Sequence, residues 1–83
     1  MSEYILDCQY DSRSSFYSKA RVRIEGNTKI LVSHTTEVAE VCEGVAKVFG
    51  EYGVTTTRHI KEFLKQEGFK AESMKQMLKD YPK

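Results

Sequence analysis

The sequence predicts an α+β fold, with an antiparallel sheet of about four strands in meander order and two short C-terminal helices packed on one face of it. The strand prediction rests on residues 16–25, where apolar and polar side chains alternate. Further extended segments follow, with turn residues between them. From residue 58 onward the apolar residues change to the spacing of amphipathic helices.

The segment FYSKARVRIE, residues 16–25, is the clearest strand. Its period of two divides it into an apolar face and a polar face, and the polar face carries Tyr17, Lys19, Arg21, Arg23 and Glu25. Residues 1–14 contain a short apolar patch followed by polar residues. We expect them to form a flexible start or a short strand ahead of a single domain over residues 15–83.

Two loops can join this strand to the next extended segment, KILVSH. One has two residues, Gly26–Asn27, and the other has three, residues 26–28. The longer loop is favoured because it sets Ile24 opposite Ile30 and keeps one face of the pair apolar. The same register places His34 at the end of that apolar face.

The third extended segment, TTEVAEVCEG, is rich in carboxylates, and Glu43-Gly44 at its end predicts a tight turn into the fourth, VAKVFGEYG. With regular alternation, Glu37 and Glu43 share a face and Glu40 lies on the other. These residues fit a solvated sheet edge that discourages unwanted strand pairing. The alternative is an acidic contact strip for a basic partner.

The segment TTTRHIKEFLKQEGF predicts the first helix, capped by one of Thr55–Thr57 and ended by Gly68. Its apolar stripe contains Ile60, Phe63 and Leu64, which are expected to face the sheet. The second helix, KAESMKQMLKDY, has its own stripe of Ala71, Met74, Met77, Leu78 and Tyr81.

Two helices around a tight turn have two interpretations. They cover the sheet, or they form a helix-turn-helix that reads DNA. In the second case the base-facing residues are Lys70, Glu72, Ser73, Lys75, Gln76 and Lys79. If the helices cover the sheet, the first helix leaves a mixed-charge outer face for a partner, made of Arg58, Lys61, Glu62 and Lys65.

The uneven distribution of charge along the chain leaves nucleic acid as an alternative partner. The 83 residues have a net charge of +1, so no global field calls for nucleic acid or membrane. Residues 55–83 carry seven Lys/Arg and four Asp/Glu, a balance of +3, against −2 for residues 1–54. The strip Lys19, Arg21 and Arg23 beside Tyr17 can also hold a nucleic-acid backbone and stack a base.

No established catalytic or metal motif stands out in the sequence. Cys8, Cys42, His34 and His59 lack the spacing of a metal site, and no glycine-rich phosphate loop is present. A Cys42–His34 nucleophile pair has neither an oxyanion hole nor a glycine elbow nearby. We therefore expect a protein without metal or cofactor that is not an enzyme. Residues 1–11 are too polar for a secretory or membrane segment, so we expect neither and expect a cytoplasmic location in the host cell.

The segments SFYSKARVRIEGNTKILVSHTTEVAEV and TTTRHIKEFLKQEGFKAESMKQMLKDY together resemble a small uncharacterised family of bacteriophages and mobile elements of Gram-positive bacteria. The most recognisable parts are SFYSKA, TEVAEV and RHIKEFLKQEGFKAE, and the resemblance covers residues 16–81. It supplies no functional residues. It implies a small protein that acts by binding a host complex.

Two functional hypotheses follow. The first is a stoichiometric inhibitor or adaptor that binds a host protein or ribonucleoprotein complex, in its sharpest form an anti-CRISPR or other anti-defence protein. The second is a small nucleic-acid-binding regulator that uses the basic helices or the basic strand face. A chain of 83 residues buries only a modest core, so formation of a homodimer would be a natural way to add stability.

Overall fold

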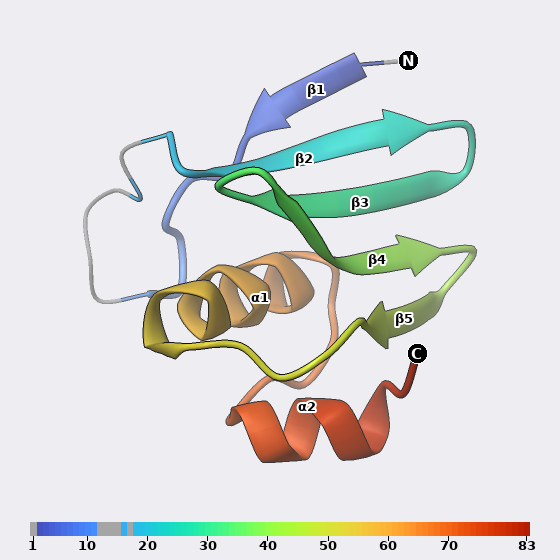
Figure 1. Ribbon diagram of the computed structural model, residues 1–83. Helices are drawn as coiled ribbons and strands as arrows, with labels where there is room; N and C mark the ends of the chain where they lie inside the picture. The colour runs from blue at the N-terminus through green and yellow to red at the C-terminus, as the bar shows by residue number, and fades with distance from the viewer. Residues whose placement is uncertain (1, 12–15, 17) are drawn as a thin grey trace.

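The five strands of the sheet follow one another in space in the order of the sequence, each antiparallel to its neighbours (Figure 1). This computed structural model describes residues 2–11, 16 and 18–83. The predicted α+β meander with two C-terminal helices is confirmed, with one strand more than expected. The strands are β1 (Ser2–Ile5), β2 (Ala20–Glu25), β3 (Thr28–Ser33), β4 (Thr36–Cys42) and β5 (Val45–Val48).

The additional strand is β1, near the start of the chain. Ser2–Ile5 pairs with β2, and Tyr4 lies opposite Val22. The strand β2 begins at Ala20 and not at residue 16, because Ser18 takes a left-handed conformation with φ of 63°. Phe16 is nevertheless buried, with its ring 4.6 Å from the ring of His59.

The predicted register between β2 and β3 is wrong. The loop has two residues, Gly26–Asn27, and Val22 lies opposite Leu31. Gly26 has φ of 61°, as the first position of a type II′ hairpin turn requires. Burial of the fully covered Val22 and Leu31 under the first helix outweighs the pairing of Ile24 with Ile30, so Ile30 moves to the outer face of the sheet.

Two further expectations for the sheet are corrected. His34 does not end the apolar face: Ser33 is opposite the buried Ala20, and His34 is an exposed turn residue with φ of 58°. The alternation along β4 is broken by an irregularity between the pairs of Leu31 and Val32, where a β-bulge shifts the register. A bulge adds one residue to a strand and reverses the faces beyond it, so Glu37 and Glu40 share the outer face.

The first helix, α1 (Val54–Gln66), lies across the inner face of the sheet (Figure 1). Ile60, Phe63 and Leu64 are fully buried, as predicted. Burying each such side chain contributes about 1.5–3 kcal/mol, which makes this stripe the main attachment of helix to sheet.

Both ends of α1 are defined by glycines. The N-cap is Gly53 and not one of the threonines, since the helix starts at Val54 and no side chain caps it. At the other end Gly68 has φ of 89° and donates its N–H to the carbonyl of Lys65. Phe69 donates to the carbonyl of Leu64 at 2.8 Å, which completes a Schellman motif and confirms Gly68 as the stop signal.

The second helix, α2 (Met74–Asp80), packs against the β5 end of the sheet. Its N-cap is Ser73, whose hydroxyl accepts the N–H of Gln76 at 3.1 Å. Met77 is fully buried in the core shared by the sheet and both helices. After the helix, the carbonyl of Tyr81 accepts the N–H of Val48 at 2.8 Å and thereby covers part of the β5 edge.

Candidate functional site

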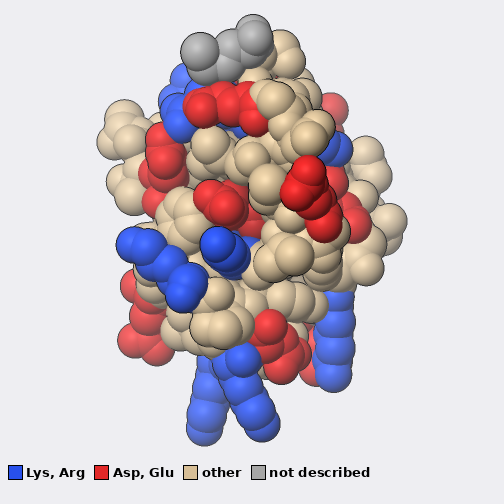
Figure 2. Space-filling view, turned by 90° about the vertical axis from the view of Figure 1, so that its right-hand side faces the viewer, with Lys and Arg blue, Asp and Glu red and all other residues tan. Residues whose placement is uncertain are grey.

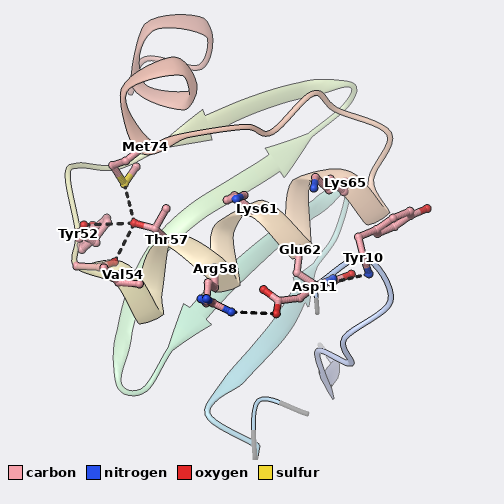
Figure 3. Close-up of a pocket in the computed structure, with 11 residues that line it drawn as sticks. Tyr10, Asp11, Tyr52, Val54, Thr57, Arg58, Lys61, Glu62, Lys65 and Met74 are labelled. Carbon is pink, nitrogen blue, oxygen red and sulfur yellow. Dashed lines mark hydrogen bonds and ion pairs between the residues drawn. The ribbon is translucent and has the colours of Figure 1, made fainter. Parts of the chain in front are cut away.

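A groove of about 600 Å³ runs along the outer side of α1. The segment before residue 12 borders it on one side, and the β5–α1 connection and α2 border it on the other (Figure 3). Its lining residues are Tyr10, Asp11, Tyr52, Gly53, Val54, Thr57, Arg58, Lys61, Glu62, Lys65 and Met74. The predicted outer face of the helix therefore lines a concave surface, which we call the α1 groove.

Glu62 does not lie on an exposed face, contrary to expectation, because its side chain is only 1% exposed. One carboxylate oxygen accepts the backbone N–H groups of Tyr10 and Asp11, both at 2.8 Å. The other accepts the amide of Gln66. Glu62 thus fastens the N-terminal segment onto α1 and builds one wall of the groove. A single carboxylate in a helix gives no sequence signal for such a distant backbone contact.

Arg58 is already paired. Its guanidinium lies 3.3 Å from the carboxylate of Asp11, whose side chain is only 12% exposed. Asp11 comes from the segment that Glu62 fastens, so the two contacts hold the same wall at neighbouring points (Figure 3). The positive charge of Arg58 therefore acts within the protein.

Lys61 and Lys65 are the open cations of the α1 groove. They are one helical turn apart, which places them side by side on the helix surface. In the part of the chain that the structure describes, no carboxylate forms an ion pair with either ammonium group. Both residues are half-buried, and long side chains of this kind keep their charged ends in water while the stem packs on the protein.

Apolar side chains lie at both ends of this cationic stretch. Tyr10, exposed by 58%, stands beside Lys65, while Tyr52, Val54 and Met74 line the opposite end (Figure 3). The hydroxyl of Thr57 donates to the carbonyl of Gly53 at 2.8 Å and lies 3.3 Å from the sulfur of Met74. These contacts tie the β5–α1 connection and α2 to the helix, and none of them was evident in the sequence.

The acidic candidates Glu37, Glu40 and Glu43 do not form a free strip. Glu37 pairs with Arg23, and Glu40 is opposite Lys47 in the sheet. Glu43 occupies the β4–β5 turn with φ of 50° and accepts a hydrogen bond from Asn27.

The basic strand face is neutralised in a similar way. Arg21 pairs with Glu3 at 3.3 Å and also donates to the carbonyl of His34. Arg23 is bound by Glu25 and Glu37, and their hydrogen bonds raise the pKa of its guanidinium. Lys19 is exposed. Tyr17, the expected stacking residue, lies outside the described residues.

The lysines around α2 remain open to solvent. Lys70 lies 3.7 Å from Glu72, while Lys75 and Lys79 form no ion pair with any described residue. Figure 2 shows the end of the molecule that carries the hairpin turns, where acidic and basic groups mix and the furthest-projecting basic side chains lie at the level of α2. Ser73 and Gln76 are engaged in the helix cap, so their polar atoms already have partners.

The two histidines lie close together, with ring centroids 5.8 Å apart for His34 and His59, but Cys42 does not join them. Cys42 is opposite Thr28 at one end of β3, and His34 follows the other end. His59 is buried, and its Nδ1 lies 2.8 Å from the hydroxyl of Ser33. Among the described residues, no three side chains of His, Cys, Asp or Glu are grouped as metal ligands.

Neither α1 nor α2 is long and apolar enough to cross a membrane. No curated protein and no solved structure matches the chain. Residues 4–79 match the model of a family of unknown function, DUF8033.

Proposed function

Since the chain belongs to the DUF8033 family of unknown function, we propose from its own geometry that it acts by stoichiometric binding of another protein, with the α1 groove as the contact surface. The observation that carries this proposal is the pair of open lysines, Lys61 and Lys65, set between apolar ends. Such a surface suits an acidic segment that also carries an apolar or aromatic side chain.

The arrangement favours a protein partner because three of the five charged lining residues, Asp11, Arg58 and Glu62, are engaged within the protein, and apolar side chains lie at both ends of the groove. Its walls are fixed by the buried Glu62 and by the Thr57 contacts, so little ordering is needed on binding. The open cations steer an acidic partner, and the apolar ends supply desolvated contact area. Tyr10 is the best candidate anchor, since tyrosine gives large contact area at low entropic cost.

In its sharpest form, the partner is a host macromolecular complex in the cytoplasm and the protein is an anti-CRISPR or other anti-defence inhibitor. What supports this form is the resemblance of the sequence to small proteins of bacteriophages and mobile elements. The geometry adds a compact surface able to block a partner site by occupying it.

Affinity capture from the host, with and without nuclease, tests the proposal. We expect a specific protein to be recovered by the wild type and lost with Lys61→Glu/Lys65→Glu. The matched control is Lys75→Glu/Lys79→Glu, which makes the same charge change on α2 and should retain the protein. Recovery of the same proteins by the wild type and the groove variant would contradict the role of the groove.

The open lysines of α2 favour a second candidate, a nucleic-acid-binding regulator. Lys75 and Lys79 are exposed and one turn apart, a spacing suited to phosphate contacts. Binding of a labelled duplex should then fall steeply as salt rises and should be lost with Lys75→Glu/Lys79→Glu, not with the groove variant. Absence of binding at low salt would end this candidate.

A further inference from the structure

The two edges of the sheet differ. At β5, Tyr81 accepts a backbone N–H from the edge strand. At β1, no described strand pairs with the outer edge. All four residues of β1 are exposed, including Tyr4 at 39% and Ile5 at 52%. An open edge with large apolar side chains on both faces is a template for pairing with another strand.

The hydrogen-bonding pattern identifies which backbone groups are open. The N–H of Leu6 donates to the carbonyl of Ala20 at 2.9 Å, which fixes the phase of the β1–β2 ladder. Because bonded pairs alternate in an antiparallel ladder, Ser2 and Tyr4 also turn their backbone groups toward β2. Glu3 and Ile5 therefore direct theirs to the free edge.

We propose that the occupant of this edge is a second copy of the chain, whose β1 pairs antiparallel with the first to make one continuous sheet. Glu3 then lies opposite Ile5 of the second copy, and each such pair exchanges both of its backbone hydrogen bonds. Tyr4 of one copy lies opposite Tyr4 of the other, on the two-fold axis. The interface is isologous, as expected of a closed dimer.

Charge selects this register. Residues opposite each other in a sheet point to the same face. Glu3 and Ile5, on the outer face of the sheet, can therefore lie only opposite outer-face residues of the second copy. Shifting the pairing by two residues in one direction sets Glu3 opposite Glu3 of the second copy, and in the other direction sets it opposite Asp7. Both place like charges against each other. The register centred on Tyr4 avoids this and pairs two aromatic rings.

A stable dimer interface buries roughly 1,200 Å² or more, and an edge of four residues buries less than that. The association is therefore weak and is expected to become visible as concentration rises from ~10 µM to ~1 mM. It does not involve the α1 groove, so the monomeric and dimeric forms present the same partner surface.

Cysteine cross-linking tests the register directly. In a Cys8→Ser/Cys42→Ser background, Tyr4→Cys should give a covalent dimer under mild oxidation. Residues at a non-hydrogen-bonded position have Cα atoms about 4.5 Å apart, within reach of a disulfide. Glu3→Cys and Ile5→Cys are the matched controls and should cross-link far more slowly. Efficient cross-linking of Glu3→Cys or Ile5→Cys, without Tyr4→Cys, would overturn the proposed register.

Sedimentation of the full chain tests the pairing itself. Glu3→Pro removes an N–H that points to the free edge and leaves the β1–β2 bonds intact, so the fold should remain while the rise in mass with concentration is lost. Glu3→Gln keeps the N–H and should still associate; circular dichroism checks the fold of both. A wild-type mass that stays monomeric up to ~1 mM, or an unchanged rise in Glu3→Pro, would refute the dimer.

Discussion

The hydroxyl of Ser33 lies 2.8 Å from Nδ1 of His59, in the buried contact between β3 and α1. Thr56 extends this contact, with its hydroxyl 3.2 Å from that of Ser33. These polar groups join the helix to the sheet at a defined position, beside the apolar stripe. Because buried polar atoms must keep their partners, they fix how far α1 can slide along β3.

Ser33→Ala should therefore destabilise the protein. The substitution removes one hydrogen-bond partner of the buried His59, and a loss of about 1–3 kcal/mol is expected. Urea unfolding measures it as a lower midpoint with an unchanged slope. Thr35→Ala, at an exposed turn position, is the control and should change the midpoint little. Equal stability of the two variants would mean that the contact adds nothing.

Glu62→Ala should release the N-terminal segment from α1. The variant deprives the N–H groups of Tyr10 and Asp11 of a charged acceptor, and such bonds contribute about 1.5–3 kcal/mol each. Hydrogen exchange should show faster exchange at these two amides than in the wild type. The exposed Glu72 provides the control variant, Glu72→Ala, which should leave both amides protected. Unchanged protection in Glu62→Ala would contradict the assigned role.

Gly68→Ala should cost about 1 kcal/mol, because φ at this position is 89° and only glycine adopts such a conformation freely. No atom lies within 4 Å of the added Cβ, so the cost arises from the backbone and not from a clash. Gly50→Ala is the control, since Gly50 is not among the glycines with positive φ and the atom nearest to an added Cβ, in Tyr52, is at an ordinary contact distance of 3.6 Å. Thermal unfolding should show a much lower midpoint temperature for Gly68→Ala than for the control variant.

The phenol of Tyr4 should ionise above the ordinary pKa of 10.0, because partial burial raises its pKa. Lys29 opposes this effect and Glu67 adds to it. We expect Lys29→Met to raise the pKa of Tyr4 further and Glu67→Gln to lower it, as followed by ultraviolet absorbance with Tyr4→Phe as the reference.

The raised pKa of Tyr4 also sets the direction in which the stability of the protein changes with pH. The folded state holds the phenolic proton of Tyr4 more tightly than the unfolded state does. The protonated phenol therefore contributes its full share to the free energy of unfolding below pH 10.0, and this share is lost as the pH rises through the pKa of Tyr4 in the folded state. Tyr4→Phe should remove this part of the alkaline loss of stability. An alkaline unfolding profile identical in wild type and Tyr4→Phe would contradict the shift.

The local pattern of the sequence was sufficient for the fold but not for the details that depend on distant partners. Gly68 and the stripe of Phe63 and Leu64 were predictable because each depends on residues within one or two helical turns. The β2–β3 register was not, because the burial of Val22 under α1 decides it, and that helix comes much later in the chain.

The candidate site shows the same division. The positions of Lys61 and Lys65 on the outer side of α1 follow from helical periodicity alone. The concavity around them does not, because it arises where Glu62 binds the backbone of Tyr10 across 52 residues of sequence. The bulge in β4 also depends on a distant partner, because it is a shift in the pairing of β4 with β3 and the sequence of β4 alone does not show it.

The separation between Tyr10 and Glu62 also sets an order of events during synthesis. A ribosome makes Tyr10 first and must add 52 further residues before the carboxylate that holds it exists. Contacts of such long range form late, after the local hairpins and helices. The α1 groove should therefore be absent from the nascent chain until almost the whole domain has emerged, so the proposed partner would recognise only the folded domain.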